Sequence, residues 1–265
     1  MTTDTNADSR VALVTGAARG IGRAIALRLA RDGFSVGVAD LAVQAEAVGQ
    51  VVTEIAEIGG KAIALETDVS DRNQVFRAVE QTSAALGGFD VMVSNAGIAQ
   101  VQQITEVTEA ELDQILRVNV NGVVWGIQAA AAELTRLGRP GRIISAASIA
   151  GIRGAGLLGV YSGTKFAVRG ITQAAAQELA PHGITVNAYA PGIVDTPMWD
   201  EVDLGLHKIN GKPIGANRQA YVDQILLGRI ETPDDVAKVV SFLAGPDADY
   251  VTGQVLIVDG GMQFN

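Results

Sequence analysis

Apolar and polar positions are arranged along the chain in alternating blocks that predict strands and helices in regular succession. Short apolar runs predict buried strands, and apolar residues recurring at helical spacing predict amphipathic helices. The predicted strands span residues 10–15, 34–40, 61–66, 89–94, 142–147, 184–190 and 255–258. The predicted helices span residues 21–32, 44–58 and 71–86, followed by a long helix that starts at Thr108 with a capping-box pattern, one that carries Tyr161 and one from Pro233. Seven apolar strands separated by helices predict an α/β fold, in which helices cover both faces of a doubly wound parallel sheet.

The chain is predicted to form a single domain over residues 10–265. Its 265 residues are 48% hydrophobic, and no repeat or low-complexity segment interrupts the alternation. Residues 1–9 are polar and acidic, so a disordered or frayed tail is expected there. Because neither a targeting segment nor an apolar run of about 20 residues is visible, we expect a cytoplasmic protein without a membrane partner.

Charge and composition exclude several classes of function. The formal net charge of −9 argues against nucleic acid or an anionic membrane as a partner, because neither attracts an acidic protein. The absence of cysteine excludes disulfides, thiolate catalysis and zinc–thiolate sites. His182 and His207 are the only histidines, which leaves almost no material for a Ser-His-Asp hydrolase or a histidine metal cluster. No metal ion is therefore expected.

A glycine-rich turn follows the first predicted strand and leads directly into the first predicted helix. Gly16, Gly20 and Gly22 occupy this turn, with Ile21 at the start of the helix. Without side chains the backbone can approach a pyrophosphate, which gains from free N–H groups and from the positive dipole end of the helix. A glycine pattern between a strand and a helix therefore predicts a dinucleotide site in a Rossmann-like fold.

The second predicted strand ends in a carboxylate, Asp40, which lies twenty residues after Gly20 and is followed by Leu41. At this spacing a dinucleotide fold presents an acid to the adenosine ribose. Asp40 would repel the extra phosphate of NADP, whereas Arg19 in the glycine turn could attract it. We expect NAD as the cofactor, because a carboxylate against the 2′ position penalises a phosphate directly while Arg19 can point to solvent.

Tyr161 and Lys165 are four residues apart on a predicted helix, and Ser148 ends the apolar run before it. Residues four apart share a helix face, so the ammonium is expected to lower the pKa of the phenol from about 10. A phenol with a lowered pKa can act as general acid and base. By itself such a pair is most often surface or packing. Other candidates, however, also lie just after predicted strands, where parallel sheets bind ligands, namely Asp68, Asn95, Ser148, Pro191 and Gly192.

Taken together, these motifs resemble the short-chain dehydrogenase/reductase family over essentially the whole chain. Residues 15–22 fit the cofactor motif of the family, residues 95–97 its sheet-stabilising motif and residues 191–196 its nicotinamide loop. One departure is Ser94, where the family more often has a second asparagine. The expected consequence is a lost local hydrogen bond.

The resemblance also implies a catalytic set. Asn119, Ser148, Tyr161 and Lys165 match the catalytic residues of the family. Ser148 and Tyr161 would hydrogen-bond and protonate a ketone oxygen, while Lys165 would bind the nicotinamide ribose. Asn119 would hold a water that links Lys165 to solvent. Without the resemblance, repair of the helix backbone would be the first interpretation of Asn119.

Further residues are implied to bind the dinucleotide. Asp68, with Val69 beside it, would receive the adenine amino group, although an Asp after a strand can equally be a turn or helix-cap residue. The Val194 backbone and Thr196 would anchor the carboxamide and the pyrophosphate, and Asn95 would support the site. Thr196 precedes a proline and could also be only a turn residue.

Within the family, the chain particularly resembles the acetoin and 2,3-butanediol dehydrogenases, also described as acetoin-forming diacetyl reductases. The informative stretches are residues 191–199 and 209–215, in the segment that covers the substrate. The resemblance implies interconversion of diacetyl, acetoin and 2,3-butanediol, and Ile149 after the catalytic serine implies a preference for (S) alcohols. Ile149 could instead only fill core space.

Gly192 and Trp199 complete the expected substrate pocket, with Trp199 in a flap over about 195–228. The alternative for Trp199 is an aromatic side chain buried at a subunit contact. Family members usually assemble as tetramers, so a homotetramer is expected. The remaining alternatives are a related enzyme, such as a 3-oxoacyl-carrier-protein reductase or a sugar dehydrogenase, and a non-enzymatic dinucleotide sensor.

Overall fold

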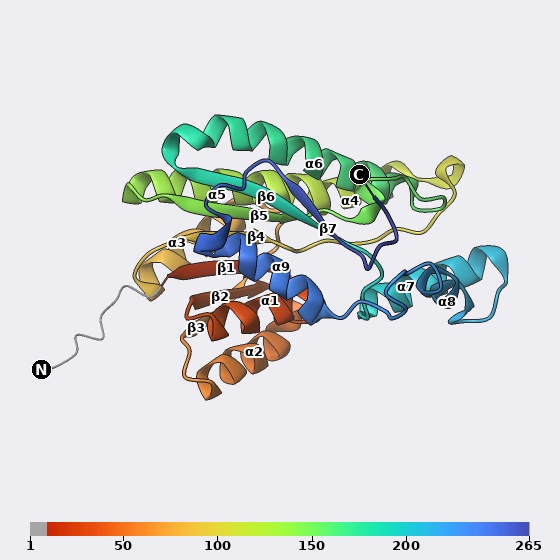
Figure 1. Ribbon diagram of the computed structural model, residues 1–265, viewed down its shortest axis with the longest axis horizontal. Helices are drawn as coiled ribbons and strands as arrows, with labels where there is room; N and C mark the ends of the chain where they lie inside the picture. Colours follow the sequence, from red (N-terminus) through yellow and green to blue (C-terminus); the bar gives the residue numbers. More distant parts are fainter. Residues whose placement is uncertain (1–9, 265) are drawn as a thin grey trace, which may run out of the picture.

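Short runs of β-branched and small apolar residues form one parallel sheet of seven strands, as the sequence pattern predicts. The computed structural model describes residues 10–264 (Figure 1). The strands are β1 (Val11–Thr15), β2 (Ser35–Asp40), β3 (Ala62–Glu66), β4 (Val91–Ser94), β5 (Gly141–Ala146), β6 (Ile184–Pro191) and β7 (Val255–Val258). They pair in the order β3-β2-β1-β4-β5-β6-β7. The order reverses between β1 and β4, and such a switch point opens a crevice at the carboxyl ends of the strands.

Helices cover both faces of the sheet. They are α1 (Gly20–Arg31), α2 (Ala45–Glu57), α3 (Arg72–Leu86), α4 (Glu109–Leu116), α5 (Gly122–Leu137), α6 (Gly159–Leu179), α7 (Pro197–Asn210), α8 (Ala216–Val222) and α9 (Pro233–Ala244). Short 3-10 turns span Ala42–Gln44, Ile104–Glu106, Ile149–Gly151, Ala180–His182 and Pro246–Ala248. Helices α1, α2 and α9 pack on one face, and α3, α5 and α6 on the other (Figure 1). Both faces are therefore buried, which explains why the central strands are apolar throughout.

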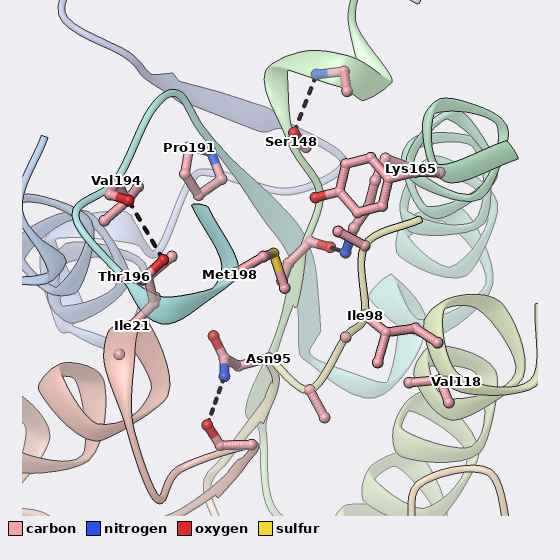
Figure 2. Close-up of a pocket in the computed structure, with 18 of the residues that line it drawn as sticks. Ile21, Asn95, Ile98, Val118, Ser148, Lys165, Pro191, Val194, Thr196 and Met198 are labelled. Atoms are coloured by element: carbon pink, nitrogen blue, oxygen red, sulfur yellow. Dashed lines mark hydrogen bonds between the residues drawn. The ribbon is translucent and has the colours of Figure 1, made fainter. Parts of the chain in front are cut away.

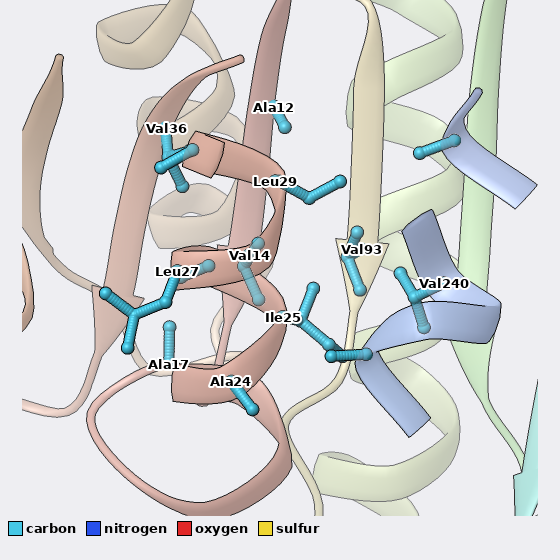
Figure 3. Close-up of a cluster of buried hydrophobic side chains, with 14 of the residues drawn as sticks. Ala12, Val14, Ala17, Ala24, Ile25, Leu27, Leu29, Val36, Val93 and Val240 are labelled. Atoms are coloured by element: carbon cyan, nitrogen blue, oxygen red, sulfur yellow. The ribbon is translucent and has the colours of Figure 1, made fainter. Parts of the chain in front are cut away.

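Two apolar cores lie between the sheet and its helices. In the first, Ile25 and Leu29 of α1 lie among Val14, Val36 and Val240, which come from β1, β2 and α9 (Figure 3). Ile25 and Leu29 are four residues apart and fully buried, as their helical spacing predicts. The second core fills the space between the sheet and α3, α5 and α6. Packing of α1 against the sheet holds the glycine turn before it in a defined position.

The long helix predicted from Thr108 is interrupted. As predicted, α4 begins with a capping box, in which Thr108 and Glu111 each bond the other's backbone N–H. Residues 117–121 then form a π-helical turn before α5 starts at Gly122. A π turn takes backbone groups out of the regular α-helical ladder and is often found at functional sites. Asn119 lies within this turn.

Residues 195–228, expected as a flap, include the two helices α7 and α8, which lie together at one end of the molecule (Figure 1). Arg218 of α8 forms ion pairs with Asp195 and Asp200, which connect α8 to the start of α7. The tail predicted at residues 1–9 lies outside the described residues. Within residues 10–264, the helices are too short or too polar to cross a bilayer.

Candidate active site

A cavity of about 900 Å³ opens at the carboxyl edge of the sheet, with Asn95, Ser148 and Lys165 on different walls (Figure 2). Its size is typical of sites that bind cofactors or small molecules. It brings together nearly all of the site residues predicted from the sequence, namely Gly16, Arg19, Gly20, Ile21, Gly22, Asp40, Leu41, Asp68, Val69, Asn95, Ser148, Ile149, Tyr161, Lys165, Gly192, Val194, Thr196 and Trp199. Asn119 does not line the cavity.

The glycine turn has a shape that leaves no room for side chains. Gly16 has a φ of +63°, a left-handed conformation that favours glycine. A Cβ on Gly22 would lie 2.1 Å from the carbonyl oxygen of Gly16 and 2.5 Å from Nδ2 of Asn95. The N-cap residue of α1 is Arg19, whose side chain makes no capping hydrogen bond. The first N–H groups of α1 are therefore left for another acceptor, and an anion is favoured there.

A hydrogen-bond chain connects this turn to β6. Nδ2 of Asn95 donates to the carbonyl oxygens of Thr15 at 2.9 Å and Gly16 at 3.1 Å. Oδ1 of Asn95 accepts from the hydroxyl of Tyr189 at 2.8 Å. Tyr189 is fully buried, and burial raises the pKa of its phenol, which therefore remains a donor. Tyr189 is absent from the sequence-based prediction, because a single hydroxyl in a buried strand carries no motif.

Asp40 is held at the end of β2 by backbone donors. Its Oδ2 accepts from the N–H of Ala18 at 2.9 Å, and its Oδ1 accepts from the N–H of Leu41 at 2.8 Å. The side chain of Arg19 is 58% exposed, and its Nη2 lies 3.8 Å from Oε1 of Glu201 on α7. Exposed ion pairs of this length contribute little free energy. The carboxylate of Asp40 is thus the better-ordered of the two charges at this end of the cavity.

The loops after β3 and β6 form two further walls. Oδ1 of Asp68 accepts from the N–H of Ser70 at 2.9 Å. Asp68 therefore acts as a turn residue, which was one of the roles that its sequence position predicted. The Thr196 hydroxyl donates to the Val194 carbonyl at 3.4 Å (Figure 2). A Cβ on Gly20 would lie 3.4 Å from Cγ2 of Thr196. The loop after β6 therefore faces the glycine turn.

Ser148, Tyr161 and Lys165 meet where β5 ends and α6 begins. The Tyr161 phenol lies near enough to the Ser148 side chain for the two to interact, and Oγ of Ser148 accepts from the N–H of Ala150 at 3.1 Å. Nζ of Lys165 donates to the carbonyl oxygen of Ala146 at 2.7 Å and lies 5.7 Å from the centroid of the Tyr161 ring. The hydroxyl, the phenol and the ammonium thus all face one cavity, in which Figure 2 labels Ser148 and Lys165.

Burial dominates the pKa values of this cluster. It raises the pKa of the Tyr161 phenol, and the interaction with Ser148 only partly offsets the rise. The expected lowering by Lys165 is therefore wrong in direction, because desolvation of the phenolate outweighs an ammonium 5.7 Å from the ring. Burial also lowers the pKa of Lys165 to about 8. Near neutral pH the site therefore holds a neutral phenol and a largely protonated lysine.

Asn119 lies behind the cavity wall. Its Nδ2 donates to the carbonyl oxygen of Ile98 at 2.9 Å and to the hydroxyl of Thr164 at 3.2 Å. Its Oδ1 accepts from the N–H of Ile98 at 2.9 Å. The side chain is fully buried and fastens the loop after β4 to α6. The side chain of Asn119 thus bonds the backbone of a loop and not that of its own helix, and the water-mediated role of Asn119 stays a prediction.

An apolar pocket adjoins Ser148. Ile149, directly after Ser148, belongs to a small buried cluster that includes Trp199, Tyr221 and Met262. The rings of Trp199 and Tyr221 have centroids 5.3 Å apart. Tyr221 and Met262 are absent from the predicted site residues, because nothing in the sequence places either side chain against Ile149. Within residues 10–264, no group of three or more His, Asp or Glu side chains is arranged to hold a metal ion.

Comparison with known proteins identifies the family. A family model described as enoyl-(acyl carrier protein) reductase matches residues 16–263. An L-2,3-butanediol dehydrogenase of Corynebacterium glutamicum is 55% identical over 97% of this chain and 100% of its own. A diacetyl reductase [(S)-acetoin forming] of Staphylococcus aureus is 50% identical over 97% of this chain and 99% of its own.

Solved structures agree with the sequence matches. A short chain dehydrogenase from Burkholderia cenocepacia J2315, solved in complex with NADP, is 36% identical with a TM-score of 0.85. The alignment covers 96% of this chain and 98% of that one. Both the glycine turn and the cluster of Ser148, Tyr161 and Lys165 lie within the matched residues. This chain therefore belongs to the short-chain dehydrogenase/reductase family.

Proposed function

We propose that the cavity is the active site of an oxidoreductase that interconverts a small ketone and a secondary alcohol. The observation that carries this proposal is that Ser148, Tyr161 and Lys165 line the same cavity as the glycine turn. A proton donor and a nucleotide-binding turn that share one cavity are the two requirements of carbonyl reduction with a nicotinamide cofactor.

The chain's own residues supply the proton. A bound nicotinamide dinucleotide supplies or accepts the hydride. The Ser148 hydroxyl binds the carbonyl oxygen, and the Tyr161 phenol, kept protonated by its raised pKa, donates its proton to that oxygen. The ammonium of Lys165, held by the carbonyl of Ala146, stabilises the phenolate that remains. In alcohol oxidation the phenolate removes the hydroxyl proton.

The donor set of the cavity fits a nicotinamide dinucleotide, and we take NAD as the preferred form. The uncapped N–H groups of α1 suit a pyrophosphate, and the glycine turn would be filled by any Cβ at Gly22. Asp40 is fixed by two backbone N–H groups and suits the ribose hydroxyls. The Burkholderia relative was solved with NADP, and Arg19 is the residue that could favour this form here. An ordered carboxylate at Asp40 opposes it.

For the substrate, we propose diacetyl, acetoin and 2,3-butanediol, with a preference for (S) alcohols. Two relatives that match nearly the whole chain are named for these compounds. The pocket beside Ser148 supports this choice, because Ile149, Trp199 and Met262 offer apolar contacts for short methyl groups. The apolar side chain of Ile149 also withholds a hydrogen bond from the second oxygen of a diketone, which biases the face presented to the nicotinamide.

The substrate is tested by following the oxidation of NADH and NADPH with diacetyl, acetoin, a 3-oxoacyl thioester, an enoyl thioester and a keto sugar. The configuration of the alcohol formed is determined by chiral analysis. We expect turnover of diacetyl and acetoin with NADH and an (S) product. Tyr161→Phe should lose most activity while still binding NADH. Turnover of a thioester in place of diacetyl and acetoin would remove the substrate proposal, and full activity of Tyr161→Phe would remove the mechanism.

We further propose that residues 195–228 act as a flap. Residues of α7 and α8, including Met198, Trp199 and Tyr221, line the cavity, so movement of these helices would change its access. NADH should protect this segment from limited proteolysis. The homotetramer and the cytoplasmic location stay predictions, and light scattering on the purified protein tests the first.

A further inference from the structure

Glu231 connects the two ends of the flap segment. It lies in the short stretch between α8 and α9, and it is only 6% exposed. Its N–H donates to the carbonyl oxygen of Ile193 at 3.1 Å, and its own carbonyl accepts from the N–H of Asp195 at 2.8 Å. Its side-chain Oε2 accepts from the N–H of Gly192 at 2.9 Å. A single residue thus makes three hydrogen bonds to residues 192–195, the loop that faces the catalytic cluster.

The other carboxyl oxygen of Glu231 is buried without a hydrogen-bond partner among the described residues. An unpaired carboxylate oxygen in such a position is costly, and the cost falls when the group is neutral. Because Glu231 is only 6% exposed, water cannot solvate its carboxylate in this position. The protonation state of Glu231 therefore affects how well its side chain fits against Gly192.

Two nearby acids, Asp235 and Asp259, also favour the neutral form of the Glu231 carboxyl group. Asp259, after β7, is also only 6% exposed, and a Cβ on Gly192 would lie 2.8 Å from the Cβ of Asp259. Asp235 of α9 is the other nearby acid, while the nearby cation, Arg229, is bound to Asp235 at 2.7 Å. Asp259 is itself held by the N–H groups of Gly261 and Gln263, both at 2.8 Å. Two buried carboxyl groups therefore flank Gly192.

One further charged residue, Asp195, lies within the loop of residues 192–195, and it is already paired. The carboxylate of Asp195 forms an ion pair with Arg218 of α8. Burial first, and then the charges of Asp235 and Asp259, raise the pKa of Glu231 to about 8, against the opposing effects of the Gly192 N–H and Arg229. At neutral pH Glu231 is therefore mostly neutral.

We propose that Glu231 is a positioning residue that acts through the loop of residues 192–195: its protonated form keeps the side-chain bond to Gly192, and its ionisation breaks this bond, loosens the loop and weakens binding of the nicotinamide half of NADH. The reason is that an ionised Glu231 must either stay beside buried Asp259 or move toward water, and the move breaks its bond to Gly192. This inference rests on the proposed binding of a nicotinamide dinucleotide in the cavity.

The first test measures the Kd of NADH by fluorescence from pH 6 to pH 9.5 for the parent chain and Glu231→Gln. Glutamine keeps an oxygen that accepts from Gly192 but cannot ionise. Lys165 titrates in the same range in both proteins, so the ratio of the two Kd values isolates Glu231. For a group with a pKa of about 8, the parent-to-variant ratio is expected to rise about tenfold between pH 7 and pH 9.

Two controls separate positioning from a general structural effect. AMP occupies only the adenosine half of the site, so its parent-to-variant Kd ratio should not change with pH. Glu133→Gln alters another acid that is 6% exposed, on α5, and its NADH ratio should stay flat. A flat ratio for Glu231→Gln, or an AMP ratio that changes as much as the NADH ratio, would overturn the proposal.

A second measurement uses the parent chain alone and does not depend on the variant folding. Hydrogen exchange of the peptide covering residues 190–196, corrected for the intrinsic effect of pH, should be faster at pH 9 than at pH 7. Unchanged protection would contradict release of the loop. If NADH fails to bind at every pH, the cofactor proposal is wrong, and the exchange experiment still decides whether Glu231 controls the loop.

Discussion

Replacing Tyr189 by phenylalanine is expected to weaken both the fold and the dinucleotide turn. The substitution keeps the ring in place on β6 and removes only the hydroxyl that donates to Oδ1 of Asn95 at 2.8 Å. Asn95 then keeps an acceptor without a protein partner, and leaving such a group unpaired costs about 1–3 kcal/mol. Because Nδ2 of Asn95 holds the carbonyls of Thr15 and Gly16, the loss also reaches the glycine turn.

The assay combines thermal denaturation with NADH titration. A loss of about 1–3 kcal/mol corresponds to a lower thermal midpoint by about 2–10 °C for a chain of this size, and the Kd of NADH should rise because the turn is less well ordered. Tyr250→Phe is the control, because Tyr250 is fully exposed and its change should stay within about 0.5 kcal/mol. If Tyr189→Phe has the same thermal midpoint and the same Kd for NADH as the parent, the hydrogen bond from Tyr189 contributes neither to stability nor to NADH binding.

Three further predictions concern the same cavity. Asp40→Asn keeps an acceptor for the N–H of Ala18 but removes the negative charge. Like charges about 4 Å apart at an effective dielectric constant of about 20 repel by about 4 kcal/mol. The NADPH-to-NADH ratio of kcat/KM should therefore rise at least about a hundredfold, and an unchanged ratio contradicts this role of Asp40. Lys165 is protonated below its pKa of about 8, so ketone reduction should be level near pH 6–7 and fall as the pH rises through 8, whereas a flat profile to pH 10 would refute its role. Gly22→Ala should abolish NADH binding, since its Cβ would lie 2.1 Å from the Gly16 oxygen, and Gly49→Ala, which meets nothing within 4 Å, should bind NADH normally.

Much of the fold could be predicted because its signals are local. Apolar runs and helical spacing depend only on neighbouring residues, and the predicted strands agree with β1 to β7 to within a residue or two at their ends. The capping box at Thr108 was visible for the same reason. The π-helical turn at residues 117–121 was not, because a turn of this kind carries no distinctive residue pattern.

The candidate site divides in the same way. Gly16, Asp40, Ser148 and Tyr161 follow strands or sit at recognisable spacings, and all four line the cavity. Tyr189 could not be identified, since its role depends on a contact between β6 and Asn95, which follows β4 and is separated from β6 by β5 in the sheet. The direction of the Tyr161 pKa shift was wrong because helical spacing predicts proximity to Lys165 but says nothing of desolvation.

The amino-acid sequence by itself determined the alternation of strands and helices, the glycine turn at the start of α1 and the residue types available for proton transfer. Each of these follows from residues that are close together along the chain. Only the tertiary structure decided which carboxyl groups are buried, which hydrogen bonds cross between strands and that Glu231 meets Gly192 at the base of the flap. Burial and long-range contacts depend on how distant segments pack, and this packing sets both the pKa values and the shape of the cavity.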